Sequence, residues 1–223
     1  MAAKASAQKA GDLPRKAARI LDALEKAHPD ARVYLDFDGP FHLLIATILS
    51  AQCTDDKVNE ITPELFRRYP SATELAAADP GDIEKLIHST GFFRQKTRSV
   101  LECSRVLAEQ HGGRVPNDMQ ALTGIRGVGR KTASVVISNA FGGQAIAVDT
   151  HVMRVSVRLG LARAKTPEKV EAALCAVIPE GRWTRATQLL GTHGRRICHA
   201  KKPDCEHCPV SKLCDFYHKS AAA

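Results

Sequence analysis

Apolar residues recur at helical spacing along most of the chain. In PRKAARILDALEKAH, residues 14–28, Ile20, Leu21 and Leu24 fall on one face of a helix that would begin at Pro14. The segment from Thr166 to Pro179 repeats this pattern, with Thr166 placed as an N-cap before a proline. Both segments predict amphipathic helices, each with one face in a core.

Two further segments test whether the chain contains strands. FHLLIATILSAQ, residues 41–52, is apolar nearly all round and predicts a helix buried in the middle of a domain. ASVVISNAF, residues 133–141, has the propensity of a short strand, but no second strand is available to pair with it. The pattern therefore predicts an all-α fold of about ten helices with short loops.

Composition narrows the class of protein. Hydrophobic residues make up 44 % of the 223 residues, which favours a globular fold over disorder. The formal net charge is +8, which favours a polyanionic partner, nucleic acid before a membrane surface. The first twelve residues lack the apolar core of a signal peptide and predict a flexible tail, and the longest apolar run is too short to span a bilayer. We therefore expect a soluble intracellular protein.

Cysteine is concentrated near the end of the sequence. Four of the seven cysteines lie within residues 198–214, in the spacing C-x6-C-x2-C-x5-C. A disulfide knot, a zinc site and an iron–sulfur cluster could each explain the cluster. In a reducing compartment clustered cysteines bind metal more often than they form disulfides, and an odd total fits a disulfide framework poorly. The two metal alternatives stay open at this point.

A glycine-rich turn in LTGIRGVGRKTASVV, residues 122–136, is the second unusual feature. Gly127 and Gly129 let the backbone approach a partner closely, and the helix expected to begin at about Val128 presents unpaired N–H groups that suit an anion. Arg130 and Lys131 add positive charge, so the turn suits a nucleic-acid phosphate. A tight turn between helices with solvated cations is the alternative. The spacing is not that of a nucleotide P-loop.

Asp149 stands before a second helical stretch, in AVDTHVMRV, residues 147–155. Taken alone it is most simply an N-cap. A carboxylate and a lysine near a phosphate-binding turn also suggest covalent chemistry on a nucleic acid.

Taken together, these motifs resemble the endonuclease III family of helix-hairpin-helix DNA glycosylases, and the similarity runs from about Pro14 to Tyr217. It includes PFHLLIATILSAQCTDDKVN and STGFFRQK. The resemblance implies a two-domain fold with DNA in the cleft between the domains. Residues 33–143 would form a six-helix domain with the hairpin, and residues 1–32 and 144–223 an iron–sulfur cluster domain.

The resemblance also implies an activity and a cofactor. The chain would be a bifunctional DNA glycosylase and AP lyase that removes oxidised pyrimidines, of the thymine glycol type, and nicks the strand by β-elimination. Lys131 would be the nucleophile, and Asp149 would stabilise charge that develops on the sugar. The ligands of a 4Fe–4S cluster would be Cys198, Cys205, Cys208 and Cys214.

DNA-contact positions carry over by the same route. Gln52 would fill the gap left by the flipped base, Phe92 would enter the base stack as a wedge, and His151 would contact the backbone or orient Asp149. The remaining expected contacts are Gly127, Gly129, Arg130 and Lys202. Cys53, Cys103 and Cys175 are expected to be small buried hydrophobic residues.

One departure concerns Arg126, which stands where the family has proline. Arg126 is therefore expected to make DNA affinity fall more steeply with salt, and Arg126→Pro, assayed over a salt series, tests this.

Two other functions are considered. A monofunctional relative of the adenine-mismatch branch would lack the lysine at position 131 and would need a further C-terminal domain. A non-catalytic DNA-binding or electron-transfer protein would be indifferent to loss of Lys131 and Asp149. The leading expectation is a monomeric enzyme, acting on damaged double-stranded DNA in the cytoplasm of a prokaryote, in association with the nucleoid.

Overall fold

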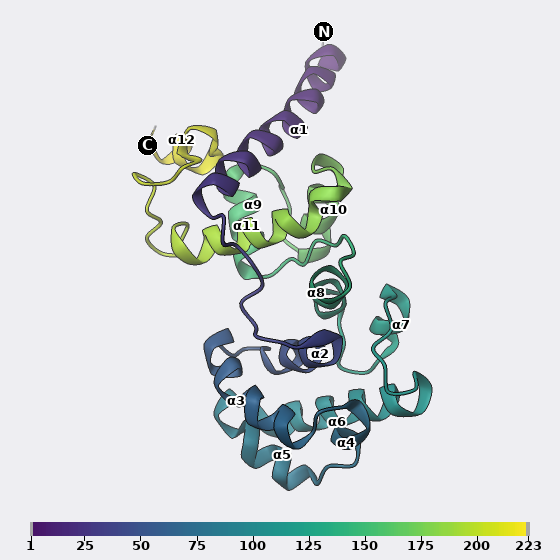
Figure 1. Ribbon diagram of the computed structural model, residues 1–223. Coiled ribbons are helices and arrows are strands. Elements are labelled where there is room, and N and C mark those ends of the chain that lie inside the picture. Colours follow the sequence, from purple (N-terminus) through teal and green to yellow (C-terminus); the bar gives the residue numbers. More distant parts are fainter. Residues whose placement is uncertain (1, 222–223) are drawn as a thin grey trace. The chain divides into compact units, whose positions relative to one another are not determined.

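The computed structural model describes the backbone of residues 2–221 and the side chains of residues 12–219. Within that range the regular elements are twelve α-helices and three short 3₁₀ helices, without a strand (Figure 1). The predicted all-α fold is confirmed. The chain divides into two units, residues 33–143 and residues 1–32 with 144–223.

The first unit, residues 33–143, is built around a buried helix. Its elements are α2 (Gly39–Leu49), α3 (Asp55–Arg68), α4 (Ala72–Ala76), α5 (Pro80–Ile87), η1 (His88–Thr90), α6 (Phe93–Gln110), α7 (Met119–Gly124) and α8 (Arg130–Ala140). Leu43, Leu44 and Leu49 of α2 are completely buried, and α2 packs against α3, α6 and α8. The helix predicted to lie in the middle of a domain does so. The possible strand at residues 133–141 is helical and belongs to α8.

This unit contains seven α-helices rather than the six implied by the family resemblance. One of the seven, α4, is a five-residue helix that packs against α6. Ser71 is its N-cap, and the Ser71 hydroxyl donates a hydrogen bond to the Glu74 carboxylate. This side-chain contact links the two ends of one short helical turn between α3 and α5, and the Ser71 side chain makes no capping bond to the backbone.

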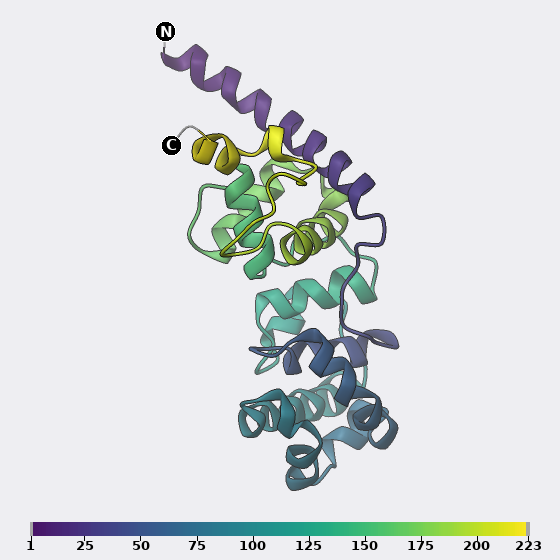
Figure 2. The ribbon, with the colours of Figure 1, turned by 90° about the vertical axis from the view of Figure 1, so that its left-hand side faces the viewer.

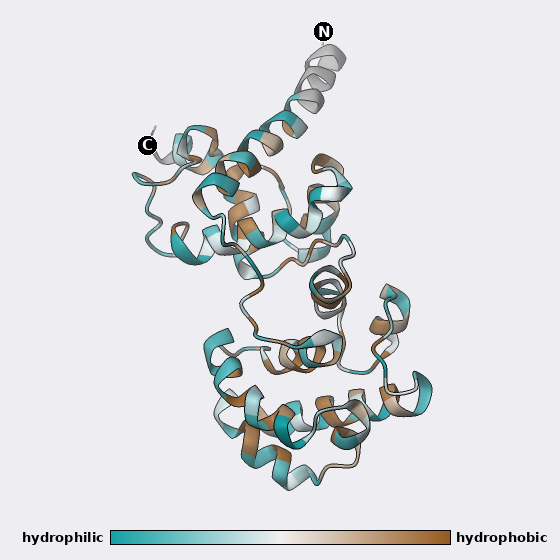
Figure 3. Cartoon of the chain, in the orientation of Figure 1, coloured by the Kyte–Doolittle hydropathy of each residue, from teal (hydrophilic) through white to brown (hydrophobic). Residues whose placement is uncertain are grey.

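The second unit groups five helices, in which α9 packs against α10, α11 and α12, and α1 packs against α10 and α11 (Figures 1 and 2). The elements are α1 (Ala2–Ala27), α9 (Thr150–Leu159), α10 (Pro167–Val177), η2 (Glu180–Arg182), α11 (Trp183–Arg196), η3 (Ser211–Leu213) and α12 (Asp215–Ala221). Ile20 and Leu24 of α1 share one hydrophobic core with Leu189 and Leu190 of α11. In both units the hydrophobic residues gather where helices face one another (Figure 3).

The helix α1 begins at Ala2 rather than at Pro14, so the expected helix start is wrong for the residues that the structure describes, whereas the flexibility of residues 1–12 stays a prediction. Alanine and lysine, which dominate the first ten residues, are strong helix formers. Pro14 lies inside the helix, where it lacks the N–H that would bond to the carbonyl four residues earlier. Helix propensity and the packing of residues 17–24 outweigh that loss.

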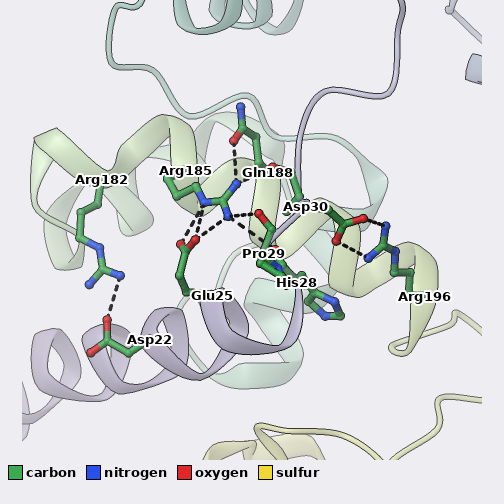
Figure 4. Close-up of polar contacts among 10 residues, drawn as sticks. Asp22, Glu25, His28, Pro29, Asp30, Arg182, Arg185, Gln188 and Arg196 are labelled. Atoms are coloured by element: carbon green, nitrogen blue, oxygen red, sulfur yellow. Dashed lines mark hydrogen bonds and ion pairs between the residues drawn. The ribbon is translucent and has the colours of Figure 1, made fainter.

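Ion pairs and carbonyl contacts join α1 and the turn after it to α11 (Figure 4). Arg185 donates to both oxygens of Glu25 and to the Pro29 carbonyl, and Arg196 forms a two-bond pair with Asp30 at 2.7 and 2.8 Å. These guanidinium groups lower the pKa of the Glu25 carboxyl and bring that of Asp30 to about 2. The first helix of the chain is thereby held against a helix that begins about 160 residues later.

In the described part of the chain, none of the helices is long and apolar enough to cross a membrane.

None of the seven cysteines forms a disulfide bond in this part of the chain. Cys103 is fully buried, as expected, and burial raises the pKa of its thiol to about 12. Cys53 and Cys175 are only half-buried, so that part of the expectation is wrong; Cys53 lies in the turn after α2, and Cys175 near the end of α10.

Candidate active site and cysteine cavity

The glycine-rich turn connects α7 to α8, as predicted, with α8 beginning at Arg130 rather than at Val128. Ile125 and Val128 are buried and hold the turn to the unit, whereas Arg126, Gly127 and Gly129 are exposed. Alternation of buried aliphatic residues with exposed glycines therefore fixes the turn and leaves its backbone accessible.

Gly127 and Gly129 have different reasons to be glycine. Gly127 has φ +89°, and a Cβ there would lie 3.3 Å from the Cβ of Ser99 on α6. Gly129 has φ −84° and is the N-cap of α8, and a Cβ there would meet nothing within 4 Å. Gly127 is therefore required by the fold. Gly129 is not, and its value is the open space that it leaves above the end of the helix.

Lys131 is the second residue of α8 and is exposed. The first N–H groups of a helix have no partner within it, and Gly129 has no side chain to cap them. They point, with the positive end of the helix dipole, into the space above Gly129. The Lys131 amine is thus attached to a helix end that is suited to hold a phosphate.

Asp149 is the N-cap of α9, and its Oδ1 accepts a hydrogen bond of 2.7 Å from the N–H of Val152. The preceding residues 145–148 are extended and buried, which fixes the backbone from which the side chain projects. The N-cap interpretation is confirmed. This does not compete with a chemical role, because capping orients the carboxylate. Lys131 and Asp149 belong to different units, so their meeting stays a prediction.

His151 is held within its own unit. Its Nδ1 lies 3.1 Å from the Arg154 guanidinium, which also donates to the carbonyls of Gly194 and Cys198. Burial lowers the pKa of His151, and nearby Asp149 counteracts part of that effect. A neutral ring with Nδ1 accepting from Arg154 fits these contacts. They give His151 a clear structural role, and contact with DNA stays a prediction.

Gln52 and Phe92 share an unusual backbone. They are the two non-glycine residues with positive φ in the described chain, at +53° and +47°. A residue with a Cβ is strained in this left-handed region. Both are exposed, and Phe92 is 63 % exposed, the most of any large hydrophobic residue described. An exposed aromatic side chain on strained backbone is what an inserting wedge would require.

The four clustered cysteines all line one cavity, together with an apolar shell that includes Val155, Leu159 and Ile197. Cys198 follows α11, Cys205 and Cys208 lie in the loop beyond it, and Cys214 precedes α12. Among the described residues, no group of three or more His, Cys, Asp or Glu side chains is arranged to hold a single metal ion. Lys201 and Lys202 lie exposed in the loop between the first two thiols.

The donors around the thiols fit an anionic sulfur-bound group. The Arg158 guanidinium donates to the Cys198 sulfur at 3.4 Å and to the carbonyls of His199 and Ala200 at 2.7 and 2.8 Å. Burial, followed by the neighbouring Cys214 and Cys198, raises the pKa of the Cys205 thiol. The same causes, with burial again the largest, raise the pKa of the Cys208 thiol to about 11. Thiols grouped around one cavity become thiolates when positive metal ions stabilise the charge.

A buried pair of histidines stands behind Cys208. His193 Nε2 lies 3.5 Å from the Cys208 sulfur, and His193 Nδ1 lies 3.1 Å from Nε2 of His28. Both rings are almost completely buried, which lowers the pKa of each and brings that of His193 to about 4. Since a metal-bound thiolate can only accept, His193 must donate from Nε2 and His28 must donate to His193.

Sequence reasoning missed His28, His193 and Arg158. His28 and His193 are 165 positions apart, and nothing in either local sequence signals the contact. It also missed Lys96, which is only 4 % exposed although it lies in a helix with an ordinary amphipathic pattern. The only available signal was a lysine four residues after the proposed wedge Phe92.

Comparison with known proteins agrees with this geometry. Residues 45–180 match the profile of the HhH-GPD superfamily of base excision DNA repair proteins, and residues 198–214 match the iron–sulfur binding domain of endonuclease III. The chain is 47 % identical to endonuclease III of Synechocystis over 201 residues, covering 90 % of this chain and 92 % of that protein. It is 41 % identical to endonuclease III of Escherichia coli K12, covering 92 % and 97 %.

Solved structures give the same result. A trapped endonuclease III–DNA covalent intermediate superimposes with a TM-score of 0.89 at 41 % identity, covering 93 % of this chain and 98 % of that one. A thermostable thymine-DNA glycosylase superimposes with a TM-score of 0.80 at 29 % identity, covering 92 % and 98 %.

The fold and the two matched regions define a helix-hairpin-helix enzyme of base excision DNA repair. Within that class, the chain belongs to the endonuclease III family. It is therefore a DNA glycosylase and AP lyase with a 4Fe–4S cluster. The monofunctional and the non-catalytic alternatives are not favoured.

Proposed function

We propose that the chain removes oxidised pyrimidines from duplex DNA, with Lys131 as the nucleophile and Asp149 as its carboxylate partner. The observation that supports this most directly is the position of Lys131, exposed at the start of α8 beside the open space above Gly129. A DNA phosphate bound at that helix end would place a sugar near the amine.

The proposed chemistry follows from those groups. With the damaged nucleotide flipped out, the Lys131 amine attacks C1′ of the sugar, the bond to the base breaks, and the base leaves with the proton that the amine gives up. The C1′–O4′ bond of the resulting aminal then breaks as O4′ takes a proton, which opens the ring and leaves an iminium between C1′ and the lysine nitrogen. The iminium acidifies the proton on C2′, and loss of that proton expels the 3′ phosphate by β-elimination. The Asp149 carboxylate stabilises positive charge that develops on the sugar and assists proton transfer.

DNA contacts and the cluster ligands complete the proposal. Gln52 and Phe92 enter the duplex, the hairpin holds a phosphate through Gly127, Gly129 and Arg130, and Lys202 contacts the backbone. His151 helps to orient Asp149. The 4Fe–4S cluster binds through Cys198, Cys205, Cys208 and Cys214, which line one cavity. The cluster shapes the loop that carries Lys202; the Arg158 contacts to that loop support this.

Borohydride trapping tests the nucleophile. Wild-type protein should form a covalent complex with duplex DNA carrying one thymine glycol or one abasic site, and Lys131→Ala should form none. Lys85→Ala, which removes an exposed lysine of α5 in the same unit, is the matched control and should trap like wild type. Trapping by Lys131→Ala would assign the nucleophile elsewhere. Trapping of the abasic site alone would retain the lyase and reject the proposed base.

A pair of substitutions separates the two roles of Asp149. Asp149→Asn keeps a good N-cap and removes the charge, whereas Asp149→Ala loses both, at about 1 kcal/mol in stability. We expect both variants to lose the activity that removes the damaged base, and only the alanine variant to have a lower melting temperature than wild type. Base removal by Asp149→Asn at the wild-type rate would show that the carboxylate acts only as a cap.

The remaining proposals concern state and location. We infer that the enzyme acts as a monomer on the bacterial nucleoid, because a glycosylase must reach chromosomal DNA and the relatives compared are bacterial. Light scattering on the purified protein, with and without a short duplex, tests the monomer. A dimeric mass in both samples would reject it.

A further inference from the structure

Lys96 is a buried cation to which the proposed chemistry assigns no task. It lies in the first turn of α6 and is only 4 % exposed. Its Nζ donates a hydrogen bond of 2.8 Å to the carbonyl of Thr90, and its backbone N–H donates to the carbonyl of Phe92 at 3.0 Å. One residue therefore holds the chain on both sides of Gly91, directly at the strained wedge position.

The segment that Lys96 holds has an unusual backbone. Gly91 has φ +69° and Phe92 has φ +47°, so two consecutive residues have positive φ. Phe92 is the N-cap of α6 and makes no capping hydrogen bond with its side chain. On the upstream side, Thr90 is buried and its hydroxyl donates to the Ile87 carbonyl at 2.8 Å. The Lys96 ammonium ties this anchored residue to the start of α6.

The loop that carries Gln52 follows α2, and α2 packs against α6. The Gln52 and Phe92 loops therefore belong to adjacent helices of one unit. Gln52 and Phe92 are the two non-glycine residues with positive φ in the described chain. Of these two loops, the Lys96 ammonium is bonded to the one that carries Phe92, through the Thr90 carbonyl.

We propose that Lys96 is a positioning residue that holds the Phe92 loop in its inserting shape. This rests on the proposed function, in which the Phe92 side chain enters the duplex. A lysine suits the task because an ammonium has three donors and no acceptor, so it can bind the Thr90 carbonyl without competing for an N–H group of the loop. Burying a cation is unfavourable, and the chain retains it where a strained loop needs an anchor.

The test compares substrates that do and do not require insertion. Lys96→Met keeps the length and removes the donors, and Lys85→Met, an exposed lysine of α5, is the matched control. Removal of thymine glycol from a duplex requires base flipping, whereas borohydride trapping on a single-stranded abasic oligonucleotide does not. Lys96→Met should slow single-turnover duplex excision by up to about 100-fold, as expected for a misplaced contact. It should leave single-strand trapping unchanged.

A second comparison asks whether Lys96 acts through the wedge. If it does, Lys96→Met combined with Phe92→Ala should be no slower on the duplex than the slower of the two single variants, because both remove the same event. Fully additive losses would overturn that route. Equal losses of Lys96→Met on duplex and single strand would show a merely structural role, and no loss on either would reject the proposal.

Two controls keep the outcomes distinct. Failure of wild-type protein on both substrates would contradict the proposed function rather than the role of Lys96. Should Lys96→Met not fold, Lys96→Gln replaces the ammonium by a shorter, neutral amide. It should slow duplex excision without affecting single-strand trapping, and unchanged duplex excision would reject the proposal.

Discussion

Replacing Phe92 by glycine should give a more stable protein than replacing it by alanine, the reverse of the usual order. At φ +47° any residue with a Cβ is strained by about 1–2 kcal/mol, and glycine is not. Glycine loses about 0.5–1 kcal/mol more than alanine through backbone entropy. The glycine variant should therefore have a free energy of unfolding roughly 0.5–1 kcal/mol higher than the alanine variant. Both variants lose the same ring, so their difference isolates the backbone.

The assay is urea unfolding of both variants, followed by circular dichroism, with the slope of each transition compared. Arg105 provides the matched control, since it is exposed on the same helix and loses the same ion pair with Glu102 in either variant. At position 105 the alanine variant should be more stable than the glycine variant by about 1 kcal/mol. Finding alanine ahead of glycine at Phe92 as well would refute the left-handed assignment and the strain argument with it.

Three further results are expected. Gly127→Ala should destabilise by about 1–3 kcal/mol in urea unfolding, because its φ is +89° and a Cβ would press on Ser99. Gly129→Ala should cost less, about 0.5 kcal/mol for a poorer N-cap, and should lose DNA affinity at low salt. Equal stabilities of the two variants would contradict the claim for Gly127. Because Arg185 lowers the pKa of Glu25, this ion pair contributes its full stabilisation above about pH 4.3 and loses it as the pH drops through the folded pKa. The fluorescence of the single tryptophan reports unfolding of the unit. An equal loss of stability in acid for Arg185→Gln and wild type would contradict this. His193→Phe removes the N–H···S bond to Cys208, so the cluster should have a lower reduction potential. The same change leaves His28 without its partner His193, so the free energy of unfolding should fall by about 1–3 kcal/mol. An unchanged reduction potential would show that the hydrogen bond does not tune the cluster.

Local patterns predicted much of the fold and of the site. Helical periodicity located the buried α2, and the glycine spacing located the hairpin, because both depend on residues that are neighbours in sequence. The N-cap at Asp149 was accessible for the same reason. The cysteine spacing reduced the candidate centres to two.

The rest depended on contacts between distant parts of the chain. Nothing near His28 indicates that its partner is His193, because only the packing of α1 on α11 brings them together. The positive φ of Gln52 is equally hidden, since glutamine has no local preference for that region. Lys96 was overlooked because a lysine in an amphipathic helix is expected on its solvent side.

The costly features of residues 33–143 are concentrated around two helix ends, the end of α2 and the start of α6. Two strained residues and one buried ammonium lie in or beside the loops after α2 and before α6, while the core around α2 is ordinary aliphatic packing. Natural chains retain such features where function needs them, and a rigid support makes them possible. Stability and duplex repair should therefore change in opposite directions when these positions are relaxed. A Gln52→Gly variant that became more stable and excised damaged bases at the wild-type rate would show that the strain serves no purpose in repair.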